Sequence, residues 1–246
     1  MRGGARNRVR TLRAATYNRP VHPTGNKTGF RDLTIDEFAA RLASSEPVPG
    51  GGSASAVAAA LGASLVSMVA SLTTGRPKYV DHEPMLAWAL ETGRRLSDRF
   101  LTIADEDAEA YAGFSAALKM PRETEAEIAA RTEAMQTAAR RASEVPLRCV
   151  EACLDLVGAA EGLAGRSNPN AASDVDVAAL LGEAAARGAA ANVLINLPST
   201  GDAEFEGAAT ARVTELLAAI EDLASQAHAA VASGERREPI EPVGRA

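Results

Sequence analysis

The sequence has 246 residues, of which 46% are hydrophobic but only 4% aromatic, so its core must consist largely of Ala, Leu and Val and suits closely packed helices better than sheets. Eight of its 26 basic residues precede the first acidic residue, Asp32, which leaves 18 basic and 32 acidic residues in the rest of the chain. That remainder has a net charge of about −14, which argues against a nucleic-acid-binding domain.

The first 31 residues form a basic segment that contains Gly, Asn, Thr and Pro and shows no periodicity. Such a segment could contact nucleic acid or an acidic membrane surface, but its composition predicts first a disordered extension. It contains no apolar core typical of a secretory signal, and we expect a cytoplasmic protein. A first helix is predicted after Thr34, whose capping box with Glu37 marks its start, and it should end near Ser45.

A glycine-rich loop follows this helix. Two prolines within residues 47–49 lead into Gly50, Gly51 and Gly52, and Ser53 stands at the expected N-cap of the next helix. Backbone N–H groups at such a helix start are open to anions and carbonyl oxygens, although a tight structural loop is the alternative. No lysine follows the glycines and no strand precedes them, so neither a Walker phosphate loop nor a dinucleotide-binding motif is predicted.

The run between Val48 and Gly75 contains no charged residue and is long enough to span a membrane. Its serines, threonines and small residues, and the absence of a second uncharged run, favour the central helix of a helical bundle over a membrane span. One apolar stripe along this helix consists of Leu61, Leu65, Met68 and Leu72. The run ends in a basic turn with Arg76 and Lys78, which could cap the helix or meet an anionic ligand.

The next helix is predicted over residues 83–119, and an acidic residue, Asp107, lies in its apolar stripe. Asp107 is four residues from both Ile103 and Tyr111, so its side chain should point toward the core. A buried carboxylate is costly unless it has a partner. Asp107 is therefore a candidate catalytic residue, with a purely structural hydrogen bond as the alternative.

A fourth helix is predicted to follow a second capping box, formed by Thr124 and Glu127. Arg131 lies close to the apolar face of this helix, either as a site residue or as an arginine at the helix margin. The three histidines of the chain do not pair at metal spacing, and two cysteines are too few ligands. We therefore expect no metal site.

A fifth helix is predicted to begin at Ser173 and Asp174. Asp174 leans toward the apolar side of this helix, although N-terminal capping alone would explain an acidic residue there. Asn192 and Asn196 lie four residues apart on the continuation of this face, and inward-facing amides need partners for both their N–H and C=O groups. A last amphipathic helix is predicted from residue 202 to 233.

No alternating strand pattern occurs along the chain. The sequence therefore predicts an all-α fold, an antiparallel bundle of about six main helices. The bundle should cover residues 32–234, between the disordered extension at residues 1–31 and a flexible, polar tail at residues 235–246.

Seven short segments in this order resemble a known family. They are PGGGS (49–53), LTTGRPKY (72–79), DEDAEAY (105–111), LKMP (118–121), VPL (145–147), SDV (173–175) and NVLINL (192–197). The family is that of the cyclodeaminases and cyclohydrolases, which includes the C-terminal domain of formiminotransferase-cyclodeaminase and the stand-alone methenyltetrahydrofolate cyclohydrolases of bacteria. The resemblance spans about residues 33–233, and its specificity comes from the ordered combination of segments rather than from any one of them.

This resemblance implies a helical homodimer, or a higher assembly, that binds tetrahydrofolate derivatives without metal or any further cofactor. Two reactions are open: elimination of ammonia from 5-formiminotetrahydrofolate to give 5,10-methenyltetrahydrofolate, and hydration of 5,10-methenyltetrahydrofolate to 10-formyltetrahydrofolate. Both act on the carbon that bridges N5 and N10, where carboxylates can transfer protons and supply negative charge. The sequence contains no formiminotransferase domain, which leaves the choice between the reactions open.

Helical spacing and the resemblance together make Asp107 and Asp174 the predicted catalytic residues. The predicted substrate-binding residues are Gly50, Gly51, Gly52, Ser53, Arg76, Lys78, Tyr79, Lys119, Arg131, Ser173, Asn192 and Asn196. The four basic residues among them should meet the anionic tail of a polyglutamylated folate, which the acidic protein body would otherwise repel. The alternative is a helical folate-binding or interaction protein without turnover; a nucleic-acid-binding module, which rests only on the basic extension, ranks third, and no membrane partner is expected.

Overall fold

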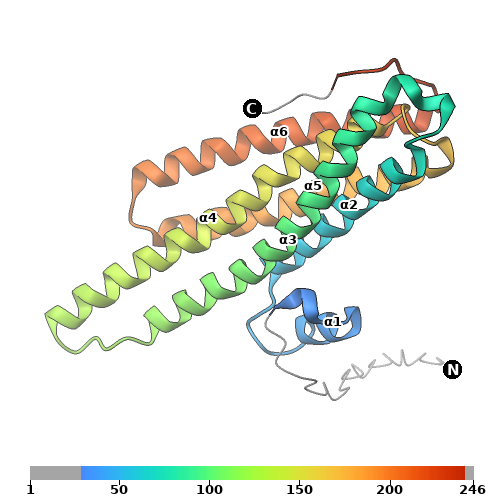
Figure 1. The fold of residues 1–246 in the computed structure, drawn as a ribbon. Coiled ribbons are helices and arrows are strands. Elements are labelled where there is room, and N and C mark those ends of the chain that lie inside the picture. Colours follow the sequence, from blue (N-terminus) through green and yellow to red (C-terminus); the bar gives the residue numbers. More distant parts are fainter. Residues whose placement is uncertain (1–28, 242–246) are drawn as a thin grey trace, which may run out of the picture.

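The computed structural model describes residues 29–241 of the chain. In this range every long element is an α-helix and no strand occurs (Figure 1). The α-helices are α1 (Ile35–Leu42), α2 (Gly51–Thr73), α3 (Glu83–Leu118), α4 (Glu125–Leu163), α5 (Ala172–Asn196) and α6 (Ala203–Ser233). Short 3-10 helices cover Phe30–Asp32, Pro77–His82, Pro169–Ala171 and Leu197–Ser199. The predicted all-α bundle is confirmed.

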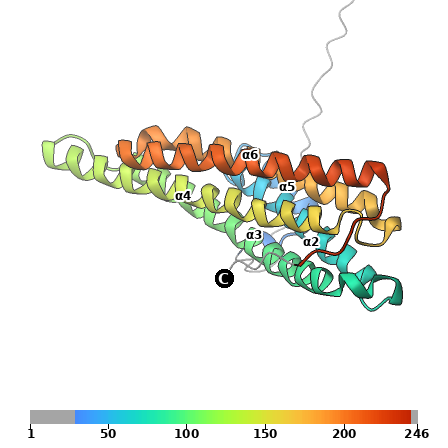
Figure 2. The same ribbon diagram turned by 90° about the horizontal axis from the view of Figure 1, so that it is seen from above.

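Helices α2 to α5 form an antiparallel bundle, and α6 packs against α4 and α5 (Figure 2). The capping boxes predicted at Thr34 and Thr124 are both present and set the starts of α1 and α4. The long helices α3 and α4 project together as a hairpin beyond the ends of α2 and α5 (Figure 1). At the base of this hairpin, the start of α2, the middle of α3 and the end of α5 lie close together.

Small residues let α3 and α5 approach α2 closely. A Cβ atom on Gly93 of α3 would lie 2.7 Å from the carbonyl oxygen of Ala63, and one on Gly62 of α2 would lie 3.1 Å from the carbonyl oxygen of Ala178 in α5. The buried side of α2 consequently consists mainly of Ala, Gly and Val.

The apolar stripe predicted on α2 lies on the outer side of the bundle. Leu61, Met68 and Leu72 are 55%, 38% and 43% exposed, because the close contacts with α3 and α5 leave no room for large side chains on the inner side. Both α2 and the segment Pro169–Ser199 are long and apolar enough to cross a membrane, but 50% and 44% of these stretches are buried inside the bundle. Such partial burial is typical of bundle helices that carry one unpartnered face.

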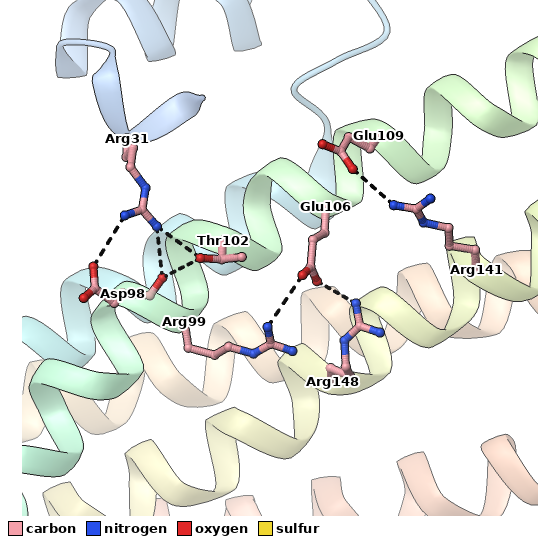
Figure 3. A network of polar contacts seen from close by, with 8 residues as sticks. All are labelled: Arg31, Asp98, Arg99, Thr102, Glu106, Glu109, Arg141 and Arg148. Atoms are coloured by element: carbon pink, nitrogen blue, oxygen red, sulfur yellow. Dashed lines mark hydrogen bonds and ion pairs between the residues drawn. The ribbon is translucent and has the colours of Figure 1, made fainter. Parts of the chain in front are cut away.

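Contacts with the helical bundle begin before residue 32, the predicted boundary of the helical domain. The Phe30 N–H donates to Asp105 Oδ1 at 2.7 Å, and the Arg31 guanidinium pairs with Asp98 and donates to Thr102 (Figure 3). These contacts attach the 3-10 turn Phe30–Asp32 to α3, so the predicted disordered extension does not include it. Residues 1–28 lie outside the described part of the chain.

Residues 235–241, which were predicted to belong to a flexible tail, contact the bundle. The Arg237 N–H donates to the Gly165 carbonyl at 3.0 Å, and Arg166 donates to the Glu238 carbonyl at 2.7 Å. Arg237 also pairs with Glu161. Residues 235–241 therefore pack across the end of α4, and residues 242–246 lie outside the described range.

The contact of Gly93 with α2 predicts a large effect of one added methyl group. We expect Gly93→Ala to lower the free energy of unfolding by about 1–3 kcal/mol, because its Cβ would meet the Ala63 backbone. Gly113→Ala is the matched control on the same helix, since a Cβ there meets nothing within 4 Å, and it should be neutral or stabilise by up to about 1 kcal/mol. Urea denaturation measures both values, and equal stabilities would contradict this account of the packing.

Candidate active site

A cavity of about 270 Å³ lies at the base of the α3–α4 hairpin. It brings together the predicted residues Gly50, Gly51, Gly52, Asp107, Asn192 and Asn196. They come from three different helix regions, the start of α2, the middle of α3 and the end of α5, which the antiparallel packing brings to one place.

The first turn of α2 forms one wall of this cavity. The helix begins at Gly51 with Gly50 as its N-cap, so the predicted N-cap position of Ser53 is wrong by one turn. Ser53 lies inside the first turn and is fully buried. The first hydrogen bond of the helix runs from the Ala54 N–H to the Gly50 carbonyl, which leaves the N–H groups of Gly51 and Gly52 without a partner in residues 29–241.

Asp107 reaches from α3 to this helix start. Its Oδ2 lies 2.9 Å from the Ser53 hydroxyl, and the Ser53 backbone N–H also donates to the carboxylate. A Cβ atom on Gly52 would lie 2.6 Å from Asp107 Cγ, so only glycine at this position permits the contact. The predicted inward orientation of Asp107 is therefore explained by a specific neighbour, the first turn of α2.

Burial raises the pKa of Asp107 above its ordinary value, and the hydrogen bonds from Ser53 oppose this rise only in part. The Ser53 hydroxyl also lies 3.1 Å from the Ala104 carbonyl oxygen. Since a hydroxyl has one proton and can also accept, it can donate to an ionised Asp107, or donate to Ala104 and accept from a protonated Asp107. The site therefore accommodates both protonation states of the carboxyl group.

The three acidic neighbours of Asp107 on α3 are held by other groups. Glu106 pairs with Arg148 at 2.5 Å and with Arg99 at 3.6 Å, and Glu109 pairs with Arg141 at 3.1 Å (Figure 3). Asp105 accepts the hydrogen bond from the 3-10 turn before α1. These contacts fix the rotation of α3 against α4 and leave Asp107 as the only carboxylate among the described residues that line the cavity.

Asn192 and Asn196 contribute hydrogen-bond acceptors. The Asn192 Nδ2 donates to the Gly188 carbonyl at 2.9 Å, and the Asn196 Nδ2 donates to the carbonyls of Ala142 and Asn192 at 2.9 and 2.8 Å. Within residues 29–241 their Oδ1 atoms have no hydrogen-bond partner. The two amides thus use their donors to stay in place and leave their acceptors for a ligand.

Tyr111 and Phe114 form an aromatic wall that was not among the predicted site residues. The sequence did contain a signal for them, because Tyr111 and Phe114 belong to the same apolar stripe of α3 as Asp107. Helical spacing alone could not show that α2 begins and α5 ends beside Asp107. The part of the α3 stripe that follows Asp107 therefore faces an open cavity and not a neighbouring helix. A carboxylate beside aromatic rings and amide acceptors suits a flat ligand with several N–H donors.

Five predicted residues lie at the opposite end of the bundle: Arg76, Lys78, Tyr79, Ser173 and Asp174. The length of α2, about 33 Å at 1.5 Å per residue, separates the two ends. Within one chain the structure therefore does not bring Asp174 to Asp107. Asp174 and Asn192 do lie on one face of α5, as predicted, but Asp174 is in its first turn and Asn192 is near its last turn.

Lys119 and Arg131 lie at the tip of the α3–α4 hairpin and do not line the cavity. The Arg131 Nε and Nη2 atoms donate to the Leu118 carbonyl at 3.3 and 3.2 Å. Arg131 thus caps the end of α3 across the turn.

Comparison with known proteins identifies related chains. The sequence model of a family described as formiminotransferase-cyclodeaminase matches residues 34–215. The methenyltetrahydrofolate cyclohydrolase of Methylorubrum extorquens is 41% identical over 172 residues, which are 70% of this chain and 83% of that protein. The formimidoyltransferase-cyclodeaminase of Rattus norvegicus is 34% identical over 197 residues, 80% of this chain, but these span only 36% of the larger rat protein.

A solved structure is also similar. The crystal structure of formiminotetrahydrofolate cyclodeaminase from Thermotoga maritima matches with a TM-score of 0.75 and 30% identity. The match covers 82% of this chain and 98% of that one. The helical fold is therefore shared over nearly the whole of that protein.

The contacts of Asp107 predict the effect of removing the Ser53 hydroxyl. Since this hydroxyl lowers the pKa of Asp107, Ser53→Ala should raise that pKa further. Ser55→Ala is the control, because the Ser55 hydroxyl donates to the Gly51 carbonyl at 2.7 Å and not to the carboxylate. Carbon-13 NMR titration of the Asp107 carboxyl measures the shift, and an unchanged or lower pKa in Ser53→Ala would show that the hydrogen bond is unimportant.

Proposed function

The chain belongs to the formiminotransferase-cyclodeaminase family, and from this membership we propose that it is a methenyltetrahydrofolate cyclohydrolase. Its relatives are folate one-carbon enzymes, as the sequence motifs predicted. The observation that carries the choice of reaction is Asp107, the one half-buried carboxylate among the described residues that line the cavity. Addition of water to a cationic carbon needs one general base, and one carboxylate is sufficient for it.

The polar groups of the cavity support binding of the pterin ring system. The Asn192 and Asn196 oxygens can accept from ring N–H and amino groups, and the open N–H groups of Gly51 and Gly52 can donate to a ring carbonyl. Tyr111 and Phe114 supply an apolar wall for the flat ring. A cavity of about 270 Å³ is at the small end for ligand sites, so the glutamate tail would extend outside it.

Asp107 can serve each step of the hydration. In its ionised form it stabilises the positive charge on the carbon that bridges N5 and N10 and takes a proton from the attacking water. The neutral adduct then receives this proton on N5 as the bond between that carbon and N5 breaks, and the hydroxyl proton leaves to solvent. The products are 10-formyltetrahydrofolate and one proton, and Asp107 is ionised again.

A cyclodeaminase is the second candidate function, favoured by the likeness to the Thermotoga maritima structure. In that reaction Asp107 would protonate the leaving ammonia, a task that its raised pKa also suits. The test is to offer both folate substrates to the purified protein and follow the methenyl absorbance, which falls in the hydration and rises in the elimination. Binding of folate without either change would indicate a protein that binds folate but does not turn it over.

The substrate is expected to be polyglutamylated, the protein to be a cytoplasmic homodimer, and the reaction to need no cofactor beyond the tetrahydrofolate substrate. In the described range no three His, Cys, Asp or Glu side chains lie together where they could hold a metal ion. Dialysis against a chelator with full retention of activity would support a metal-free reaction.

Replacing Asp107 by Asn should separate catalysis from stability. We expect kcat to fall about 10²–10⁴-fold while folate still binds, because the amide keeps the shape but cannot take the proton. Burial raises the pKa of Asp107 in the folded protein above its value in the unfolded chain. Ionised Asp107 therefore lowers the free energy of unfolding as the pH rises above the unfolded pKa. Asp107→Asn should therefore be at least as stable as wild type at pH 7, as measured by thermal unfolding.

The pH profile provides an independent measurement of the same assignment. In the wild type kcat/KM should fall as the pH decreases through the raised pKa of Asp107, since the base must be ionised, and this limb should vanish in Asp107→Asn. Glu109→Gln is the control, because Glu109 lies two residues away on α3 but pairs with Arg141. Near-normal kcat in Asp107→Asn, or a comparable loss in Glu109→Gln, would rule out the assignment.

The two adjacent glycines of the α2 start give a matched pair of variants. A Cβ on Gly52 would displace the Asp107 carboxylate, whereas one on Gly51 would lie 3.5 Å from Asn192 Nδ2, an ordinary contact. Gly52→Ala should lower kcat/KM by about 10²-fold, because a displacement of about 1 Å in a catalytic group has effects of this size. Gly51→Ala should keep kcat/KM near the wild-type value. A larger loss of kcat/KM in Gly51→Ala than in Gly52→Ala would contradict the importance of the Gly52 contact.

A further inference from the structure

Helix α4 contributes to the cavity through its backbone. Ala142 is its one residue among the described lining residues, and an alanine side chain has no polar group. The Ala142 carbonyl oxygen nevertheless takes part in the site, because it accepts a hydrogen bond from Asn196 Nδ2 of α5 at 2.9 Å. A carbonyl inside a helix normally accepts from the N–H group four residues later, so the reason why this one is available lies at that position.

The residue four positions after Ala142 is Pro146, which lies inside α4 and is buried. Proline has no N–H group, so Pro146 cannot donate to the Ala142 carbonyl, and its ring also pushes against this carbonyl. A partly buried carbonyl without a partner is unfavourable, and the Asn196 amide satisfies it from the neighbouring helix. The proline thus makes one backbone oxygen of α4 available as an attachment point for α5.

The Asn196 amide nitrogen has two protons and two acceptors in this arrangement. It donates to the Ala142 carbonyl at 2.9 Å and to the Asn192 carbonyl at 2.8 Å. The reverse orientation of the amide would place Oδ1 against two carbonyl oxygens, so these neighbours determine which atom is Nδ2 and which is Oδ1. With Nδ2 held by two helices, Oδ1 is fixed as an acceptor at the cavity.

The position of Asn196 in the fold makes the bond to α4 important. Asn196 is the last residue of α5, and its bond to Asn192 stays within the same helix end. Helix ends fray more readily than helix interiors. The Ala142 carbonyl, in contrast, belongs to the interior of α4, the longest helix of residues 29–241. The bond between them therefore ties the Asn196 amide to a rigid part of the bundle.

We infer that Pro146 is a positioning residue for substrate binding: it frees the Ala142 carbonyl, which holds the Asn196 amide so that its Oδ1 faces the ligand. The inference rests on the proposed function for the identity of the ligand, a folate whose pterin ring presents N–H donors. Pro146 is not among the described residues that line the cavity, so it acts through Asn196. A proline that only bends α4 for packing would affect stability but not the affinity for a folate.

Replacing Pro146 by Ala tests this role, because the new N–H group at position 146 can donate to the Ala142 carbonyl in place of Asn196. We expect KM for 5,10-methenyltetrahydrofolate to rise about 3–10-fold, the effect of one hydrogen bond, with kcat nearly unchanged because the contact is made equally in the ground and transition states. Thermal unfolding should show no loss of stability, since proline is the least favourable residue in a helix interior. An unchanged KM in the folded variant would overturn the inference.

Gly158→Ala is the matched control on the same helix. It also replaces a weak helix former of α4 by alanine, and its Cβ would come no closer than 3.9 Å to the nearest atom outside the α4 backbone, Leu223 Cδ1. This variant should therefore keep the wild-type KM. An equal rise of KM in Gly158→Ala and Pro146→Ala would show that the stiffness of α4, and not the Ala142 carbonyl, determines the affinity, and would overturn the inference.

A double-variant cycle shows whether Pro146 acts through Asn196. Asn196→Ala removes the acceptor and should raise KM at least as much as Pro146→Ala does. Adding Pro146→Ala to Asn196→Ala should cause no further rise, because the amide that the proline positions is already absent. Independent effects, whose fold-changes multiply in the double variant, would contradict the positioning role.

The hydrogen bond can also be observed without substrate, which separates this inference from the proposed function. In nitrogen-15-labelled wild-type protein the Asn196 side-chain NH2 protons should exchange slowly with solvent, and they should exchange faster in Pro146→Ala but not in Gly158→Ala. Rapid exchange in the wild type would overturn the inference, even if Pro146→Ala failed to fold. Slow exchange in a wild type that acts on neither folate would contradict the proposed function and support the hydrogen-bond arrangement.

Discussion

The contact between Asp107 and the first turn of α2 depends on the absence of a side chain at Gly52. This glycine lets α3 approach the helix start closely enough for the carboxylate to accept from both the backbone and the hydroxyl of Ser53. Since the same contact removes the carboxylate from water, it raises the pKa while the hydrogen bonds hold the group in place. Packing, charge and orientation at the site thus follow from one close helix approach.

The other acidic residues of this part of α3 show how the chain separates structural from functional carboxylates. Glu106 and Glu109 face arginines of α3 and α4, and Asp105 binds the turn before α1. Exposed pairs of this kind add little stability individually. Their effect is to hold α3 in one rotation, in which Asp107 faces the cavity and has only hydroxyl and amide partners among the described residues. A base that must gain and lose a proton is better served by such partners than by an arginine, which would keep it ionised.

The small residues of α2 connect the interior of the bundle to its surface. Because Ala and Gly occupy the inner side, the leucines and the methionine of this helix face outward, next to the apolar residues of α5. The close packing that builds the core therefore also leaves large apolar side chains exposed on the outer side of α2 and α5.

The sequence by itself determined the helical class, the capping boxes at Thr34 and Thr124, the family, and the faces on which Asp107, Asn192 and Asn196 lie, because these depend on spacing along one helix. The tertiary structure decided which neighbour covers each face and where each helix ends relative to the others. It turned the α2 stripe outward, exposed Tyr111 and Phe114 to a cavity, and placed Asp174 at the far end of the bundle from Asp107. Helical periodicity fixes the direction of a side chain around its own axis, but it contains no information on the length and approach of the neighbouring helices, which depend on contacts between distant parts of the chain.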